Sequence, residues 1–205
     1  MNFYNLKHKE EQLNFKEATI KGQGKDKGLF FPEDISKFSN EFLQNLPNLS
    51  NEEIAFQVMK DFAGDEIPEA ELRKIVAETI AFEIPLKKVT ENISVLELFH
   101  GPTLAFKDVG ARFMSRCLGY FLKNETRKVT VLVATSGDTG GAVANGFYDV
   151  EGIEVVILYP KNRVSPVQEK QLTALGKNIH ALPPFFIQII RIIPFRILNR
   201  FKIKK

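Results

Sequence analysis

The segment Val129-Thr-Val-Leu-Val-Ala-Thr-Ser-Gly-Asp-Thr-Gly-Gly141 decides the fold, because it joins an apolar run directly to a glycine-rich turn. Residues 129–133 have the composition of a buried strand, and the glycines at 137, 140 and 141 let the backbone approach a ligand closely. A helix that opens here directs its backbone N–H groups and the positive end of its dipole toward one point. The segment therefore predicts a strand, an anion-binding turn and a helix.

Strand and helix patterns alternate on both sides of this segment. We expect strands at residues 93–99, 128–134 and 153–159, and helices at residues 108–122, 140–148 and 165–175. The last helix has an N-cap serine, Ser165, and a proline, Pro166, at its first position. This order predicts an α/β fold with a partial parallel sheet and helices on both of its faces.

Residues 1–82 lack this alternation and predict a mainly helical region. Apolar residues recur at helical spacing over residues 51–62, Gly64 marks the end of that helix, and Pro68 starts another. The end of the region, near residues 82–85, is the expected linker to the α/β part.

A glycine-rich turn, Gly22-Gln-Gly-Lys-Asp-Lys-Gly28, lies between a predicted helix at residues 11–20 and a short predicted strand at residues 29–31. A phosphate-binding fingerprint needs a preceding strand and a third glycine that opens a helix. Neither is present, so we interpret this segment as a turn.

A second motif, Glu97-Leu-Phe-His-Gly-Pro-Thr-Leu-Ala-Phe-Lys-Asp108, follows the first predicted strand of the sheet. Lys107 lies in the loop after that strand, where open α/β sheets place their ligands, and Asp108 is the expected N-cap of the next helix. The apolar residues 104–106 are expected to desolvate the Lys107 amine, which favours its uncharged, nucleophilic form. On spacing alone, however, a lysine beside an aspartate is more often half of a surface ion pair.

Together, the two motifs resemble threonine synthase, a family of fold-type II pyridoxal-phosphate enzymes, and the resemblance extends over residues 4–182. It implies that Lys107 holds pyridoxal 5'-phosphate covalently and moves protons on the substrate. It also implies conversion of O-phospho-L-homoserine and water to L-threonine and phosphate. The implied cofactor contacts are Gly137, Asp138 and Thr139, and the implied substrate contacts are Thr135, Ser136, Gly137, Thr139 and His100. On the residues alone, a structural role for His100 is equally open.

Two other functional hypotheses remain. Another fold-type II enzyme, such as a threonine dehydratase or cysteine synthase, would share the lysine and the glycine-rich segment, but residues 101–108 and the helical N-terminal region argue against it. The second hypothesis is a non-catalytic fragment that associates with a partner through an open sheet edge. It arises because the chain is about half the length that the resemblance implies, and no segment is a candidate for binding the cofactor phosphate or the pyridine nitrogen.

The resemblance divides the chain into three parts. Residues 1–82 are the expected threonine synthase N-terminal domain, and residues 83–182 are part of the catalytic domain. Residues 183–205 contain no acidic residue and leave the family pattern abruptly, which we interpret as the product of a frameshift or truncation. A basic, membrane-seeking tail is the alternative, although Pro194 would interrupt its helix.

The composition is that of an ordinary globular protein. The chain has 205 residues, a formal net charge of +3 and 44% hydrophobic residues, and its lysines alternate with acidic residues, so no nucleic-acid partner is expected. Cys117 is the single cysteine, which excludes an internal disulfide and leaves too few thiols for a structural zinc site. No run before Pro183 approaches a membrane-spanning length. We therefore expect a cytoplasmic protein that acts on a small molecule and binds no metal.

Overall fold

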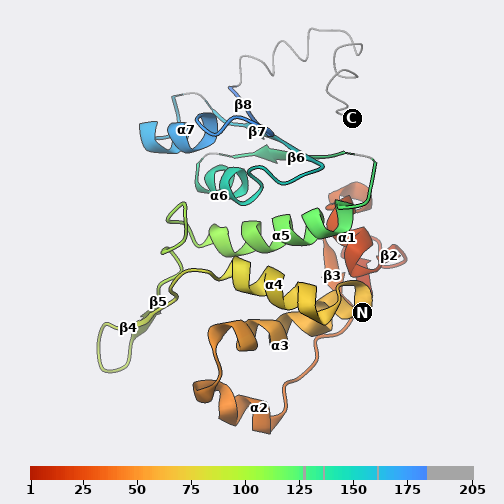
Figure 1. Cartoon of the computed structure of the whole chain (residues 1–205), viewed down its shortest axis with the longest axis vertical. Helices are drawn as coiled ribbons and strands as arrows, with labels where there is room; N and C mark the ends of the chain where they lie inside the picture. The colour runs from red at the N-terminus through yellow and green to blue at the C-terminus, as the bar shows by residue number, and fades with distance from the viewer. Residues whose placement is uncertain (127, 136, 161, 184–205) are drawn as a thin grey trace. The chain divides into compact units, whose positions relative to one another are not determined.

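The computed structural model describes residues 1–126, 128–135, 137–160 and 162–183, and the chain divides into two compact units (Figure 1). The N-terminal unit contains Met1–Ala81 and Arg116–Phe121, and the C-terminal unit contains Phe82–Ser115 and the described residues from Leu122 onward. The segment that was interpreted as an aberrant tail lies outside the described residues, apart from Pro183.

The N-terminal unit begins with a three-stranded antiparallel sheet in the order β2-β1-β3. Its strands are β1 (Phe3–Asn5), β2 (Gln12–Leu13) and β3 (Phe30–Pro32), of which only β3 was predicted. The helix predicted at residues 11–20 is shorter, because α1 (Phe15–Lys21) starts only after Asn14. Asn14 and Glu17 form a reciprocal capping box that defines this start.

The glycine-rich turn at residues 22–28 wraps around the buried side chain of Asn5. A Cβ atom at Gly24 would lie 2.4 Å from Asn5 Nδ2, and one at Gly28 would lie 1.7 Å from Asn5 Oδ1. These two glycines are therefore required for packing, and the interpretation of the segment as a turn is confirmed.

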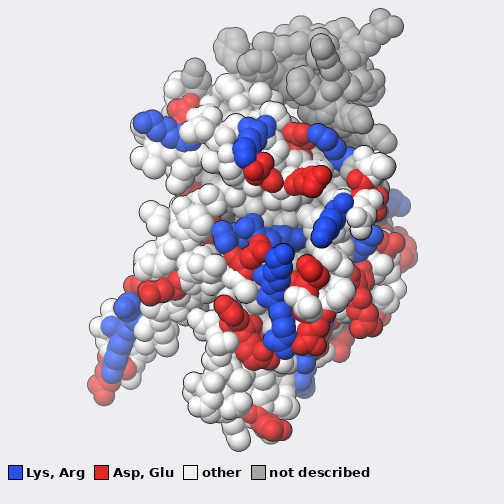
Figure 2. Space-filling view, viewed as in Figure 1, with Lys and Arg blue, Asp and Glu red and all other residues white. Residues whose placement is uncertain are grey.

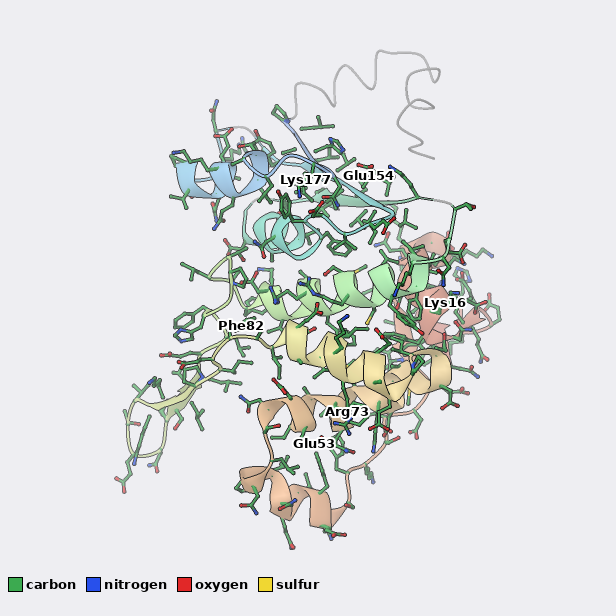
Figure 3. The ribbon with its side chains drawn as sticks, in the orientation of Figure 1. Lys16, Glu53, Arg73, Phe82, Glu154 and Lys177 are labelled. Carbon is green, nitrogen blue, oxygen red and sulfur yellow. The ribbon has the colours of Figure 1, made fainter. Side chains whose placement is uncertain are left out.

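The helices α2 (Asn40–Asn45), α3 (Asn51–Ala63) and α4 (Glu69–Thr79) complete the N-terminal unit. Short 3₁₀ turns occupy Lys25–Lys27, Leu46–Asn48 and Gly64–Glu66. The predicted helices at residues 51–62 and after Pro68 are confirmed, with Ser50 as the N-cap of α3. Arg73 joins the two helices, because it binds Glu53 at 2.7 Å and its guanidinium carbon lies 3.7 Å from the centroid of the Phe56 ring (Figure 3).

The C-terminal unit begins with an antiparallel hairpin of β4 (Leu86–Lys88) and β5 (Ser94–Leu96). All six of these residues are exposed. The sequence placed residues 93–99 in the parallel sheet, and this prediction is wrong. β5 pairs with β4 instead, because residues 89–93 allow the chain to turn back on itself, with Ile93 O accepting from Val89 N at 2.9 Å.

After the hairpin, helix α5 (Lys107–Leu122) precedes a three-stranded parallel sheet. Residues Arg116–Phe121 of this helix belong to the N-terminal unit. The remaining elements are β6 (Val129–Ala134), α6 (Asp138–Gly146), β7 (Ile153–Leu158), α7 (Pro166–Thr173) and β8 (Ile179–Leu182). The strand order is β6-β7-β8, with Val131 opposite Val155 and Val155 opposite Ile179. The predicted α/β class and the parallel sheet are confirmed, whereas β8 was not predicted.

The core of the C-terminal unit lies around the central strand β7, where Val155 and Ile157 are fully buried. At the edge of the described sheet, Leu132 on β6 is 55% exposed. Helix α6 packs against α5 through its small residues, since a Cβ atom at Gly146 would lie 3.0 Å from the backbone carbon of Ala111. The packing therefore joins the helix that starts at Lys107 to the helix that follows the glycine-rich turn.

Charged residues are distributed without a dominant sign. Figure 2 shows that basic and acidic side chains are intermixed over the face in view.

The one cysteine, Cys117, is fully buried, and burial raises the pKa of its thiol to about 12. It therefore packs as a small apolar residue.

Candidate active site

Lys107 is the first residue of α5, and its side chain is half-buried. Its ammonium nitrogen lies 4.7 Å from the centroid of the Phe106 ring, which is a cation–π contact. Of the three apolar neighbours that were expected to desolvate the amine, only Ala105 is buried, whereas Leu104 and Phe106 are 74% and 61% exposed. Because these two side chains are themselves exposed, they do not shield the Lys107 amine from water.

Asp108 is a buried residue that holds the loop before it. Its carboxylate accepts hydrogen bonds from Thr103 N at 2.9 Å and from Thr103 Oγ1 at 2.6 Å, and its relative exposure is 1%. A Cβ atom at Gly101 would lie 2.6 Å from Asp108 Oδ2, so a glycine is required there. The predicted N-cap role is wrong, because α5 already begins at Lys107 and the Asp108 side chain bonds back to the preceding loop.

The hydrogen bonds of Asp108 also test the interpretation of Lys107 as half of a surface ion pair. Because both carboxylate oxygens bind Thr103, they are not directed at Lys107. Within the described ranges, no carboxylate lies within ion-pair distance of the Lys107 ammonium. A half-buried primary amine without an ion pair fits a cofactor that presents an aldehyde. The ordinary surface ion pair is therefore the wrong interpretation.

The glycine segment (residues 134–141) connects β6 to α6 and is organised by Thr135. The Thr135 hydroxyl oxygen accepts from Gly137 N at 3.1 Å and from Gly140 N at 3.0 Å. Gly137 has a φ of +155° at the N-cap of α6, a conformation that side chains rarely adopt. Two of the N–H groups that were expected to converge on an anion therefore point at Thr135.

The Thr135 hydroxyl can still donate a hydrogen bond of its own. A hydroxyl oxygen that accepts two N–H groups still carries its own hydrogen, and accepting them strengthens it as a donor. Asp138 and Thr139 follow Thr135 closely in the sequence, and both are exposed in the first turn of α6. Ser136 lies outside the described residues. The segment thus offers a hydroxyl donor at a helix N-terminus, an arrangement that suits a carboxylate.

Gln168 on α7 contacts the glycine segment, and the sequence analysis did not identify it as a site residue. Its Nε2 donates to Asp138 Oδ1 at 2.7 Å, and a Cβ atom at Gly137 would lie 2.6 Å from the same nitrogen. The signal that was available is its position in the Ser165-Pro-Val-Gln168 capping box. That signal predicts a helix start but gives no indication of a contact with α6.

His100 is oriented by its own loop. Its Nε2 lies 2.8 Å from Glu97 Oε2, and its ring stacks on Phe99 with 4.8 Å between the centroids. The described part of the chain shows no hydrogen bond between His100 and the glycine segment or Lys107. These contacts support the structural role that the sequence left open, and they leave Nδ1 available for a ligand.

A cavity of about 660 Å³ lies elsewhere, in the N-terminal unit. It is lined by Phe56, Asp61 and Leu72 among others, and by none of the predicted site residues.

The described residues contain no helix that is both long and apolar enough to cross a membrane.

Comparison with known proteins identifies the family. Residues 78–188 match the model of the family described as "Pyridoxal-phosphate dependent enzyme". This chain belongs to the pyridoxal-phosphate-dependent enzymes. Residues 2–80 match a second family model, "Threonine synthase N terminus". The match to the family model confirms the expected membership of the pyridoxal-phosphate-dependent enzymes, whose cofactor is pyridoxal 5'-phosphate.

The proteins that this chain resembles include named threonine synthases. The threonine synthase of Haemophilus influenzae is 49% identical over 182 residues, which are 89% of this chain and 42% of that protein. The crystal structure of threonine synthase from Escherichia coli superposes with a TM-score of 0.83 at 44% identity, over 89% of this chain and 42% of that chain. A structure of PLP-bound threonine synthase from Brucella melitensis gives a TM-score of 0.85 at 34% identity. The match covers 97% of this chain and 46% of that chain.

The length of the match is as informative as its identity. The chain spans 42% of the length of the curated Haemophilus influenzae relative, although nearly nine-tenths of the chain takes part in the match. The matched family model ends at residue 188, close to residue 182, where the resemblance was expected to end. The matched residues thus cover less than half of the length of this relative.

Proposed function

We propose that this chain carries the lysine-bearing part of a threonine synthase site, which converts O-phospho-L-homoserine and water to L-threonine and phosphate. The observation that carries the proposal is the Lys107 amine, which is half-buried and has no ion pair in the described residues because Asp108 binds Thr103 instead. The match of residues 2–80 to the threonine synthase N terminus supports this substrate over those of a threonine dehydratase or cysteine synthase.

In this proposal Lys107 attaches pyridoxal 5'-phosphate and afterwards serves as the proton carrier. When bound, the cofactor supplies an electron sink for the substrate carbon atoms. With the substrate amine bound to the cofactor in place of the lysine, the Lys107 amine would take protons from the α carbon and the β carbon of the substrate. Phosphate would leave from the γ carbon, which would receive one proton back, and water would add at the β carbon with return of the other proton to the α carbon. Thr103 and Asp108 keep the amine in place through the loop before α5.

The glycine segment orients the substrate. The Thr135 hydroxyl, whose oxygen is already bonded to Gly137 N and Gly140 N, donates its proton to the substrate carboxylate. Ser136, Gly137 and Thr139 are the further proposed contacts of that carboxylate, and Asp138 is proposed to face the cofactor ring with Gly137 and Thr139. His100, held by Glu97, is proposed to contact the substrate phosphate through Nδ1. The site is proposed to act in the cytoplasm on this small molecule.

Titration of the purified chain with pyridoxal phosphate tests the proposal. We expect an absorbance band of bound cofactor in wild type and none with Lys107→Ala. Lys123→Ala is the matched control, because Lys123 is exposed just after the other end of the same helix. Borohydride reduction followed by peptide mass mapping should place the label on Lys107 alone. A folded wild-type sample without the band would contradict the proposal and favour a non-catalytic role.

A further inference from the structure

Gln168 makes three hydrogen bonds that together link two helices of the C-terminal unit. At the start of α7, its backbone N donates to Ser165 Oγ at 3.2 Å, and its side-chain Oε1 accepts from Ser165 N at 3.1 Å. The remaining end of the side chain, Nε2, donates to Asp138 Oδ1 at 2.7 Å. The amide group is thus oriented by the cap of its own helix, with the NH₂ directed at the first residue of α6.

The backbone of the glycine segment is adapted to this side chain. Gly137 has a φ of +155°, and a Cβ atom there would lie 2.6 Å from Gln168 Nε2 and 2.9 Å from Gln168 Cδ. A larger residue at position 137 would displace the amide from Asp138. The contact therefore depends on the same glycine that shapes the turn after β6.

We propose that Gln168 is a positioning residue for the site, and that its amide fixes the orientation of the Asp138 carboxylate at the N-terminus of α6. Free rotation of an exposed aspartate side chain would spread its charge over several rotamers. A donor at 2.7 Å selects one of them. This inference rests on the proposed function in that Asp138 is one of its cofactor contacts.

A merely capping role for Gln168 predicts a different response to one substitution. Gln168→Glu keeps the shape and the Oε1 acceptor of the capping box, and a negative charge near a helix N-terminus is favourable. If Gln168 only caps α7, this variant is as stable as wild type or more stable. If Gln168 positions Asp138, the variant places two carboxylates in contact and is less stable.

Four proteins decide between these roles: wild type, Gln168→Glu, Asp138→Asn and the double variant. We expect Gln168→Glu to raise the unfolding equilibrium constant roughly five- to tenfold at neutral pH, which is the size of a like-charge contact in a water-like medium. In the double variant, the asparagine amide introduced at position 138 can donate to the new carboxylate, so most of the loss should be regained. Additive effects of the two substitutions would overturn the proposal.

Cofactor binding is the second readout, and it separates this inference from the proposed function. We expect Gln168→Glu to lower the affinity for pyridoxal phosphate, measured on the band that depends on Lys107, by about tenfold. An unchanged affinity would overturn the positioning role, since the contact would then serve stability alone. If wild type itself shows no such band, the proposed function fails, and the unfolding cycle still decides whether Gln168 fixes Asp138.

Discussion

Two strand-forming regions of the C-terminal unit both contain aliphatic residues but have opposite environments. The hairpin of β4 and β5 contains Leu86, Val95 and Leu96, all of which are exposed. The central strand β7 contains Val155 and Ile157, both fully buried. The first region precedes the Lys107 loop, and the second lies beside the glycine segment. The difference teaches that an apolar strand becomes core only where neighbouring elements cover it.

The cause lies in the partners of each strand. β7 pairs with β6 on one side and β8 on the other, and α6 packs against it. The hairpin has a single ladder, and an isolated two-stranded hairpin is marginally stable in water. We therefore expect the sheet to provide most of the stability of this unit.

A matched pair of isoleucines tests this comparison with the largest expected effect. Ile157→Ala removes fully buried methyl groups and should lower the free energy of unfolding by about 2 to 5 kcal/mol. Ile93→Ala, at a hairpin position that is 57% exposed, should lower it by less than about 0.5 kcal/mol. Urea unfolding followed by circular dichroism gives both values. Equal losses would mean that the hairpin is covered in solution.

A buried aspartate gives the next largest effect and probes the Lys107 loop. Asp108→Ala removes the acceptor of Thr103 N and Thr103 Oγ1 and should cost about 1 to 3 kcal/mol of unfolding free energy. Asp34→Ala, at an exposed position, is the control and should change it by less than about 0.5 kcal/mol. If Asp108→Ala were as mild as the control, the loop would not depend on this carboxylate.

The smallest effect concerns the charged end of the sheet. Glu154 on β7 binds His180 on β8 at 2.9 Å and Lys128 at 3.1 Å, and Figure 3 labels it on its strand. The hydrogen bond from His180, followed by that from Lys128, lowers the pKa of Glu154 below its ordinary value of 4.5. The unfolded chain therefore binds a proton more readily, so this contribution is present above pH 4.5 and is lost as pH falls through the folded pKa.

For these partly exposed groups the contribution is about 0.2 to 1 kcal/mol. The difference in unfolding free energy between wild type and Glu154→Gln should be visible at pH 6 and should become smaller as the pH falls below 4.5. His180→Gln, which removes the main partner, should reduce the same difference. A difference that stays constant between pH 6 and pH 3 would show that the ionised Glu154 carboxylate does not stabilise the sheet.

Local signals in the sequence were sufficient for most helices of the chain. The boundaries of α3 and α7 follow from Ser50 and Ser165, whose hydroxyls accept backbone N–H groups that otherwise lack partners. β3, β6 and β7 also follow from their apolar runs. The partner of β5 could not be predicted, because an apolar run does not say whether it pairs with the strand before it or with one farther along the chain.

The candidate site shows the same division. The sequence identified Lys107 and the glycine segment, because their residue types are required by the chemistry itself. It could not assign the environment of Lys107, since Asp108 was as suitable for an ion pair or an N-cap as for the contact with Thr103 that it makes. It also could not find Gln168, which lies thirty residues from its partner Asp138.

The sequence by itself determined the family, the α/β order of elements and the two chemical motifs, because each depends on residue type and short spacing. Only the tertiary structure decided that Gln168 meets Asp138, which lies thirty residues away, whereas the contacts of Asp108 with Thr103 and of Thr135 with two glycine amides form within one loop. The physical reason is that a hydrogen bond requires its two atoms to approach within about 3 Å. Where the residues are far apart in the chain, that approach is produced by the packing of helices and strands and not by local sequence.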